Sequence, residues 1–119
     1  MKYTLSQTEQ DIMKLLWQKK QWFSAADFWV YFNNNGKECK RQTIHTYLVR
    51  MEEKGFLVKN KKKYMYAFTE EEFAQKKAKE VLDTMFNGSL KQLIVALAGN
   101  KNISSEEANE LKDYLNDLD

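Results

Sequence analysis

The chain carries few side chains that are suited to covalent chemistry. Its one histidine is His45 and its one cysteine is Cys39, and we find no glycine-rich phosphate loop and no legible acid–base pair. We therefore predict that the protein is not an enzyme and holds no metal and no cofactor. The lone cysteine excludes an intrachain disulfide and a cysteine metal cluster. Residues 41–50 (RQTIHTYLVR) instead offer side chains that bind other molecules through hydrogen bonds and apolar contacts.

Residues 41–54 are predicted to form a helix with two unlike faces. Ile44, Tyr47, Leu48 and Met51 recur at helical spacing and form the buried stripe. A solvated face would carry mainly Glu and Lys. The opposite face is instead centred on Gln42, Thr46, Val49 and Glu53 and flanked by His45 and Arg50, so half of these positions are amide, hydroxyl or apolar. Amide, hydroxyl and cationic groups hydrogen-bond to base edges, and an exposed valine suits a thymine methyl group, so this face is predicted to read base pairs.

Two further helices are predicted before this one, and each has a recognisable start. Ser6 and Glu9 form a capping-box pattern that begins a helix over residues 7–19. Ser24 begins the next helix in the same way, and the run NNNG at residues 33–36 ends it. These two helices are expected to supply the apolar surface against which the third helix packs.

Residues 56–68 are predicted to form a β-hairpin. Two β-prone segments with alternating hydrophobicity flank a turn of three lysines, Lys61 to Lys63, soon after Gly55 ends the third helix. Three helices followed by a hairpin are the parts of a winged helix, in which the third helix enters the major groove and the hairpin, the wing, contacts the DNA backbone. Lys59 and the lysines at the turn can neutralise phosphates, and Tyr64 or Tyr66 can add a hydroxyl contact to a phosphate. The alternative is that both tyrosines pack across the hairpin.

The charge divides into a basic front part and an acidic rear part. Residues 1–69 hold 13 Lys or Arg against 6 Asp or Glu, whereas residues 70–119 hold 6 against 11. A basic front part favours a polyanionic partner. We therefore predict a winged-helix DNA-binding domain over residues 1–69 and a helical dimerisation domain over residues 70–119.

Three amphipathic helices are predicted after residue 69. Their apolar surface exceeds what a small winged helix needs covered, so we expect it to be buried between two chains of a homodimer. The alternative is that these helices fold back on their own domain. The residues predicted to make the dimer contact are Leu82, Met85, Phe86, Leu93, Leu97, Leu111, Leu115 and Leu118.

The sequence also bears on where the protein acts. No apolar run is long enough to span a membrane, and the N-terminus lacks the apolar core and the cleavage site of a signal peptide. We therefore expect a cytoplasmic protein without membrane insertion. Nothing marks the thiol of Cys39 as activated, so an inert side chain is favoured over a redox role.

The order and spacing of several segments resemble the penicillinase-repressor family, the winged-helix repressors of β-lactamase, methicillin-resistance and some copper-transport operons. The likeness covers almost the whole chain. It lies in LSQTEQDIMKLLWQKK, TIHTYLVRMEEKGFL, KKKYMYAF, FNGSLKQLIVAL and SEEANELKDYLNDL. The resemblance implies a homodimeric transcriptional repressor that binds a palindromic operator in double-stranded DNA.

The resemblance also implies roles for single residues. By motif match, Thr43, Thr46 and Arg50 are carried over as DNA-contacting positions. Relatives that answer to a β-lactam sensor are inactivated by a sensor protease at an Asn-Phe bond, and the matching pair in this chain is Ala96 and Leu97. Copper-responsive relatives carry Cys-x-Cys near the C-terminus, which this chain lacks.

The sequence thus predicts a mainly α fold with a small β-hairpin, made of a winged helix-turn-helix and a helical dimerisation region. The alternative function is a protein-interaction module without DNA, because a protein partner would equally explain a helix face that is not solvated. The operator sequence, the regulated genes and the inducing signal stay open. The residues predicted to contact DNA are Arg41, Gln42, Thr43, His45, Thr46, Val49, Arg50, Lys61, Lys62, Lys63 and Tyr64.

Overall fold

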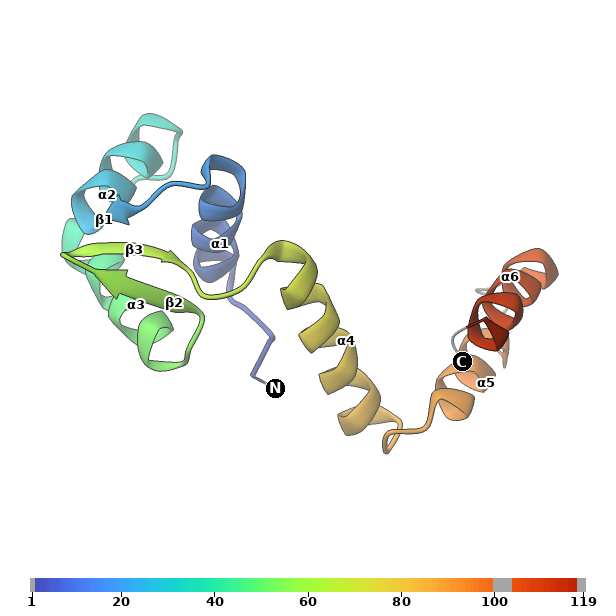
Figure 1. Cartoon of the computed structure of the whole chain (residues 1–119). Coiled ribbons are helices and arrows are strands. Elements are labelled where there is room, and N and C mark those ends of the chain that lie inside the picture. The colour runs from blue at the N-terminus through green and yellow to red at the C-terminus, as the bar shows by residue number, and fades with distance from the viewer. Residues whose placement is uncertain (1, 100–103, 118–119) are drawn as a thin grey trace. The chain divides into compact units, whose positions relative to one another are not determined.

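A computed structural model of the chain describes residues 2–99 and 104–117 (Figure 1). It divides into two compact units, Met1–Lys77 and Ala78–Asp119, which are described separately below. None of the helices in the described ranges is long and apolar enough to cross a membrane. The elements are α1 (Gln7–Lys19), β1 (Phe23–Ser24), α2 (Ala25–Asn34), α3 (Arg41–Glu53), β2 (Leu57–Asn60), β3 (Lys63–Tyr66), α4 (Glu70–Met85), α5 (Leu90–Gly99) and α6 (Ser105–Asn116).

The first helices start at the predicted caps. At α1, Ser6 Oγ accepts the Glu9 N–H at 3.3 Å, and a Glu9 carboxylate oxygen accepts the Ser6 N–H at 2.9 Å. Ser24 and Asp27 repeat this arrangement at α2, at 3.1 and 2.9 Å. Such pairs satisfy backbone donors that the first helical turn leaves without an intrahelical acceptor. The predicted starts of both helices are therefore confirmed.

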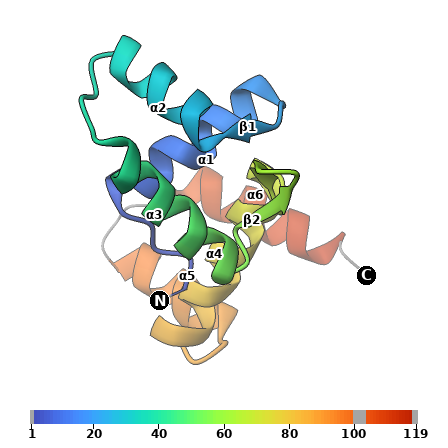
Figure 2. The same cartoon turned by 90° about the vertical axis from the view of Figure 1, so that its left-hand side faces the viewer.

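The buried core lies in the first unit, which includes the helices α1, α2 and α3 (Figure 2). Each of these helices turns an apolar stripe inward. Burying a large aliphatic or aromatic side chain contributes about 1.5–3 kcal/mol relative to leaving it exposed. Packing of these stripes is therefore the main term that holds the three helices together. Among the residues described, the buried apolar side chains are Ile12, Met13, Leu15, Leu16, Phe28, Phe32, Ile44, Leu48, Met51, Phe56, Leu57, Tyr64 and Phe68.

The sheet of this unit has three antiparallel strands in the order β1-β3-β2, so β3 is the central strand. The predicted hairpin is confirmed, with Lys59 opposite Tyr64 and Asn60 opposite Lys63. On the other side of β3, Phe23 of β1 lies opposite Tyr64. The strand β1 is not among the predicted elements, because two residues are too few to show a period-two pattern. Only the tertiary pairing with β3 creates it.

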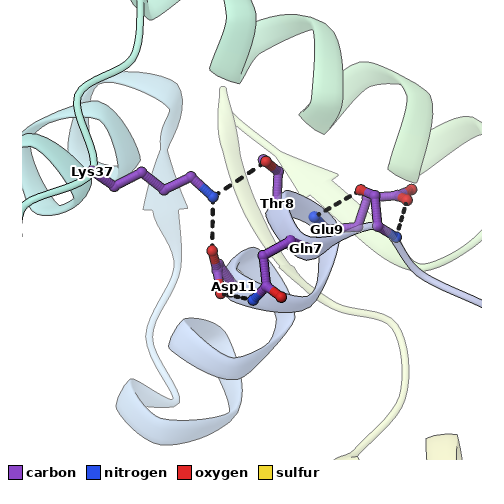
Figure 3. A network of polar contacts seen from close by, with 6 residues as sticks. Gln7, Thr8, Glu9, Asp11 and Lys37 are labelled. Atoms are coloured by element: carbon purple, nitrogen blue, oxygen red, sulfur yellow. Dashed lines mark hydrogen bonds and ion pairs between the residues drawn. The ribbon is translucent and has the colours of Figure 1, made fainter.

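The loop between α2 and α3 is tied to α1 by Lys37 (Figure 3). The Lys37 ammonium group lies 2.7 Å from one carboxylate oxygen of Asp11 and donates to Thr8 Oγ1 at 3.2 Å. Gln7 Nε2 donates to the other Asp11 oxygen at 2.9 Å. The hydrogen bond from Lys37 is the main reason why the pKa of Asp11 lies below its ordinary value. This network fixes the loop just upstream of α3.

The first turns of α4 pack on α1 within the first unit. Trp17 Nε1 donates to the carbonyl of Phe68 at 3.1 Å, and the Trp17 ring lies 5.5 Å from the ring of Phe73. Phe68 and Phe73 stack with their ring centroids 6.0 Å apart, as the two members of a hydrophobic staple. These contacts explain why the first unit includes the beginning of α4.

The second unit consists of the rest of α4 together with α5 and α6. Ser104 caps α6 by accepting the Glu107 N–H at 3.1 Å. Among the described residues, neither α4 nor α5 has a buried side chain. Met85 and Val95 are 66% and 60% exposed. Helices in proteins owe most of their stability to a packed apolar face, and this unit provides little of that packing within one chain.

Candidate nucleic-acid interface

The helix α3 carries its buried and its exposed side chains on opposite faces, and β2 packs beside it (Figure 1 and Figure 2). Ile44, Leu48 and Met51 are fully buried. Among the predicted contact residues of this helix, Arg41, Gln42, Thr43, His45 and Arg50 are exposed, whereas Thr46 and Val49 are half-buried. Because the buried stripe faces the core, the predicted contact residues lie on the side of α3 that faces solvent.

The two ends of α3 differ in their chemistry. The N-cap residue Lys40 makes no side-chain capping bond, and the first turn holds Arg41 but no acidic residue. Positive charge here adds to the positive end of the helix macrodipole, so this terminus attracts anions. At the other end Gly55 has a φ of +86°, and the Phe56 N–H donates to the Met51 carbonyl at 2.9 Å. This glycine-dependent end turns the chain into β2.

The hydroxyl group of Thr46 is engaged within α3. It donates to the carbonyl of Gln42, one turn earlier, at 3.0 Å. A hydroxyl group has one proton, so this bond leaves Thr46 with its methyl group and an acceptor lone pair for a ligand. The methyl group is the part that can meet a thymine methyl in the major groove.

Lysines in an uncommon backbone conformation form the turn of the wing. Lys61 and Lys62 have φ values of 51° and 67°, and Asn60 lies opposite Lys63, so the hairpin closes through a two-residue turn. Turns of this type favour Asn-Gly, because other L-residues lose about 1–2 kcal/mol each in the left-handed region. Lys61, Lys62 and Lys63 are all exposed. The turn therefore concentrates positive charge at the wing tip in spite of backbone strain.

Tyr64 does not lie on the surface of the wing. Its side chain is 2% exposed and belongs to the core. Its ring is buried because β1 pairs with β3 at Phe23 and makes β3 a central strand instead of an edge strand. The contact of its hydroxyl group with a phosphate stays a prediction. Only the outer end of this side chain is still available, where Tyr64 lines a cleft.

This cleft has a volume of about 310 Å³ and lies between the start of α2, the start of α3 and the wing. The start of α2 is not among the predicted contact residues. The Ser24 cap locates the start of α2 in the sequence, but its place beside the wing depends on the pairing of β1 with β3. The residues that line the cleft are Ser24, Ala25, Ala26, Arg41, His45, Lys59, Lys62 and Tyr64.

The described residues predicted for dimerisation lie on α4, α5 and α6, except Phe86, which directly follows α4. Leu82, Phe86, Leu93 and Leu111 are half-buried, whereas Met85 and Leu97 are exposed. The side chain of Leu115 and the whole of Leu118 lie outside the described residues. The described members thus keep much of their apolar surface accessible in a single chain.

Comparison with known proteins agrees with this architecture. The family model described as penicillinase repressor matches residues 5–117. The chain belongs to the penicillinase repressor family. A penicillinase repressor of Staphylococcus aureus is 30% identical over 118 residues, which cover 96% of this chain and 92% of that protein.

Two further members of the family match over similar lengths. The methicillin resistance regulatory protein MecI of Staphylococcus aureus strain N315 is 24% identical, over 96% of this chain and 94% of its own. A penicillinase repressor of Bacillus licheniformis is 26% identical, over 93% of this chain and 88% of its own. The likeness to the penicillinase repressor family therefore extends over both units, and the predicted mainly α fold with its small β-hairpin is confirmed.

Proposed function

We propose that this member of the penicillinase repressor family is a transcriptional repressor that binds a palindromic DNA operator as a homodimer. The observation that carries the proposal is the outward face of α3, where polar and β-branched side chains lie opposite a fully buried stripe and beside a lysine-rich turn. The names of the relatives, penicillinase repressor and methicillin resistance regulatory protein, support the same function.

In this proposal α3 lies in the major groove and reads bases. Gln42 forms a bidentate pair with adenine, Arg50 donates to a base edge or a phosphate, and Val49 meets a thymine methyl group. One well-made bidentate contact discriminates between bases by about 1–3 kcal/mol. The wing contributes contacts that do not depend on sequence, through Lys61, Lys62 and Lys63.

The homodimer rests on the second unit. The described side chains of α5 are all half-buried or exposed, although this helix is mostly apolar. Burying such surface between two chains yields about 25 cal/mol per Å² before the cost of association. A two-fold dimer presents two copies of α3 to two half-sites, so the operator is a palindrome with half-sites spaced by whole helical turns.

Selection of binding sites from a random duplex pool tests this proposal without a known operator. The full-length chain is expected to enrich a two-fold symmetric sequence whose half-site centres lie about 10–10.5 base pairs apart, or a multiple of this. Enrichment of an asymmetric site, or of no sequence at all, would contradict a palindrome-reading dimer.

Two variants then separate base reading from backbone contact on the selected site. Gln42→Ala combined with Arg50→Ala is expected to weaken binding to the selected site by about 2–4 kcal/mol and binding to random duplex far less. Lys61→Ala combined with Lys62→Ala is expected to weaken binding to both DNAs and to reduce the salt dependence. Equal losses on both DNAs from the first variant would argue against base reading by α3.

A protein-interaction module is the second candidate, and one observation favours it. Trp22 and Val30 are 41% and 48% exposed and line the same hollow beside α2, which a protein partner could cover. Failure of the full-length chain to bind any duplex at low salt would favour this function over DNA binding.

A sensor protease that inactivates the repressor is part of the same proposal. The pair that stands at the family's cleavage position, Ala96 and Leu97, lies on α5 with both side chains exposed. Mass spectrometry of the chain recovered from induced cells tests whether the bond between them is cut. Recovery of the intact chain from induced cells would exclude cleavage as the switch.

A further inference from the structure

The cleft beside the wing collects positive charge from three elements. Arg41 comes from the first turn of α3, Lys59 from β2 and Lys62 from the wing turn, and the imidazole of His45 lines the cleft beside them. The described residues that line the cleft include no Asp and no Glu. A hollow that is lined by cationic groups on several sides concentrates the field and favours an anion.

The hydroxyl group of a buried tyrosine also faces this cleft. Tyr64 is 2% exposed, and its hydroxyl makes no hydrogen bond with any residue that the structure describes. Among these residues every fully buried side-chain donor or acceptor has a partner. The Tyr64 hydroxyl must therefore keep what little accessible surface this residue has, and Tyr64 lines the cleft. The hydroxyl group of a buried side chain normally has a hydrogen-bond partner. This one has none among the described residues, so it is free to donate to a ligand.

Backbone donors complete the site. The Ser24 hydroxyl caps the N–H of Asp27, but the N–H groups of Ala25 and Ala26 have no acceptor within α2. Both of these residues line the cleft. Such N–H groups at the positive end of a helix bind phosphate oxygens well. Backbone, hydroxyl and cationic donors therefore converge on one volume.

We propose that this cleft is a binding site for one phosphate group. The Tyr64 hydroxyl and the N–H groups of Ala25 and Ala26 donate to its oxygens, and the surrounding cations balance its charge. The phosphate group comes either from the backbone of bound DNA or from a free phosphate ion that occupies the cleft when DNA is absent. The first source rests on the proposed DNA-binding function, and the second does not.

The first arm of the test uses the full-length chain without DNA. Inorganic phosphate is titrated against chloride at constant ionic strength and pH, and the amide resonances of Ala25 and Ala26 are followed by NMR. We expect saturable shifts in the wild type. Tyr64→Phe, which removes only the hydroxyl group, should weaken this binding about tenfold. Tyr66→Phe is the matched control, because Tyr66 lies on the same strand but does not line the cleft.

The second arm measures the affinity for duplex DNA with the same variants. If a backbone phosphate occupies the cleft, Tyr64→Phe weakens duplex binding about tenfold more than Tyr66→Phe does. Free phosphate then also weakens duplex binding more than chloride does at the same ionic strength. A response in the first arm alone assigns the cleft to free phosphate. A response in the second arm alone assigns it to the DNA backbone.

The outcomes separate this site from the proposed function. No response in either arm overturns the phosphate site, even if the wild type binds its operator. Absence of duplex binding by the wild type overturns the proposed function, while the first arm still decides on the site. If Tyr64→Phe does not fold, Lys59→Gln replaces it, with Lys14→Gln on α1 as the control of equal charge change. Equal phosphate affinity of these two variants also overturns the site.

Discussion

Lys37 shows how a single surface contact holds the loop that leads into α3. It joins the loop before α3 to Asp11 of α1 at 2.7 Å, and the side chains of Lys37 and Asp11 are 32% and 28% exposed. A partly exposed ion pair of this kind contributes little to overall stability, about 0.2–1 kcal/mol. Its importance lies in where it acts, because the loop that it holds leads directly into α3.

The ion pair predicts a pH dependence of stability. The hydrogen bond from Lys37 lowers the pKa of Asp11 below its ordinary value of 3.8. A lowered pKa means that the stabilisation is complete well above pH 3.8 and is lost as the pH falls through the lower pKa of the folded state. Asp11→Asn should therefore cost about 0.5–1 kcal/mol of unfolding free energy at pH 7, measured by urea unfolding.

The difference between wild type and Asp11→Asn should shrink as the pH falls below 3.8, because the protonated aspartate then resembles asparagine. Glu38→Gln is a suitable control, since Glu38 is an exposed carboxylate in the same loop. A difference that stays constant from neutral to acid pH would mean that the ion pair contributes nothing.

Thr46 gives a second prediction at the scale of one residue. Because its hydroxyl group already donates to the Gln42 carbonyl at 3.0 Å, the methyl group is expected to make the contact with DNA. Thr46→Val keeps the methyl group and should retain operator affinity within about threefold. Thr46→Ser keeps the hydroxyl group and should lose about 1 kcal/mol, in a filter-binding or fluorescence anisotropy titration.

The opposite result, with Thr46→Ser retained and Thr46→Val impaired, would assign the contact to the hydroxyl oxygen. The helix content of both variants is checked by circular dichroism. Valine and serine have similar helix propensities, but only serine can donate a hydrogen bond to the carbonyl one turn earlier, which can bend a helix. Equal helicity would assign any difference in affinity to the DNA contact.

At the scale of elements, the wing turn carries positive charge in a backbone conformation that lowers the stability of the fold. Lys61 and Lys62 hold positive φ values where the turn type favours Asn-Gly. Lys61→Asn combined with Lys62→Gly should raise the unfolding free energy by about 1 kcal/mol. The same variant should bind DNA more weakly, with a salt-dependence slope that falls by up to about 1.8 per bound chain.

Lys61→Gln combined with Lys62→Gln separates the two effects. It removes the same two charges but keeps the strained backbone, so it should reduce the salt slope equally without the gain in stability. An unchanged salt slope in both variants would place the wing tip outside the DNA interface. A loss of stability in the Asn-Gly variant would show that the turn is not strained.

At the scale of the whole molecule, the second unit is predicted to bring two chains together. Met85 and Leu97 are 66% and 36% exposed in one chain, so a charge at these positions costs the single chain little. Met85→Asp combined with Leu97→Asp should therefore give a monomer by analytical ultracentrifugation while the first unit stays folded. Affinity for a full operator should fall about 10²- to 10⁴-fold, because the two half-sites are no longer linked.

Gln92→Asp is the control for this prediction, since it adds a negative charge to an exposed polar position of α5. It should leave the mass in solution unchanged. A dimer that survives the double substitution would assign these two residues to a solvated surface and would require another explanation for the unburied helices α4 and α5.

The helices, the hairpin and the outward face of α3 follow from the sequence alone, because they depend on local signals. Capping pairs such as Ser6 with Glu9 fix the helix starts through contacts three residues apart, and the apolar spacing of Ile44, Leu48 and Met51 decides which face of α3 packs inward. Each of these signals lies within a few residues of the chain, so it can be found without the tertiary structure.

The tertiary structure alone decided what lies on the far side of β3. Pairing of Phe23 with Tyr64 joins segments about forty residues apart in the sequence, and a two-residue strand leaves no periodic pattern. That one pairing buries the Tyr64 ring, turns its hydroxyl group toward the cleft and brings the start of α2 beside the wing. Long-range pairing is set by the packing of the whole unit, so no local pattern could have revealed the cleft.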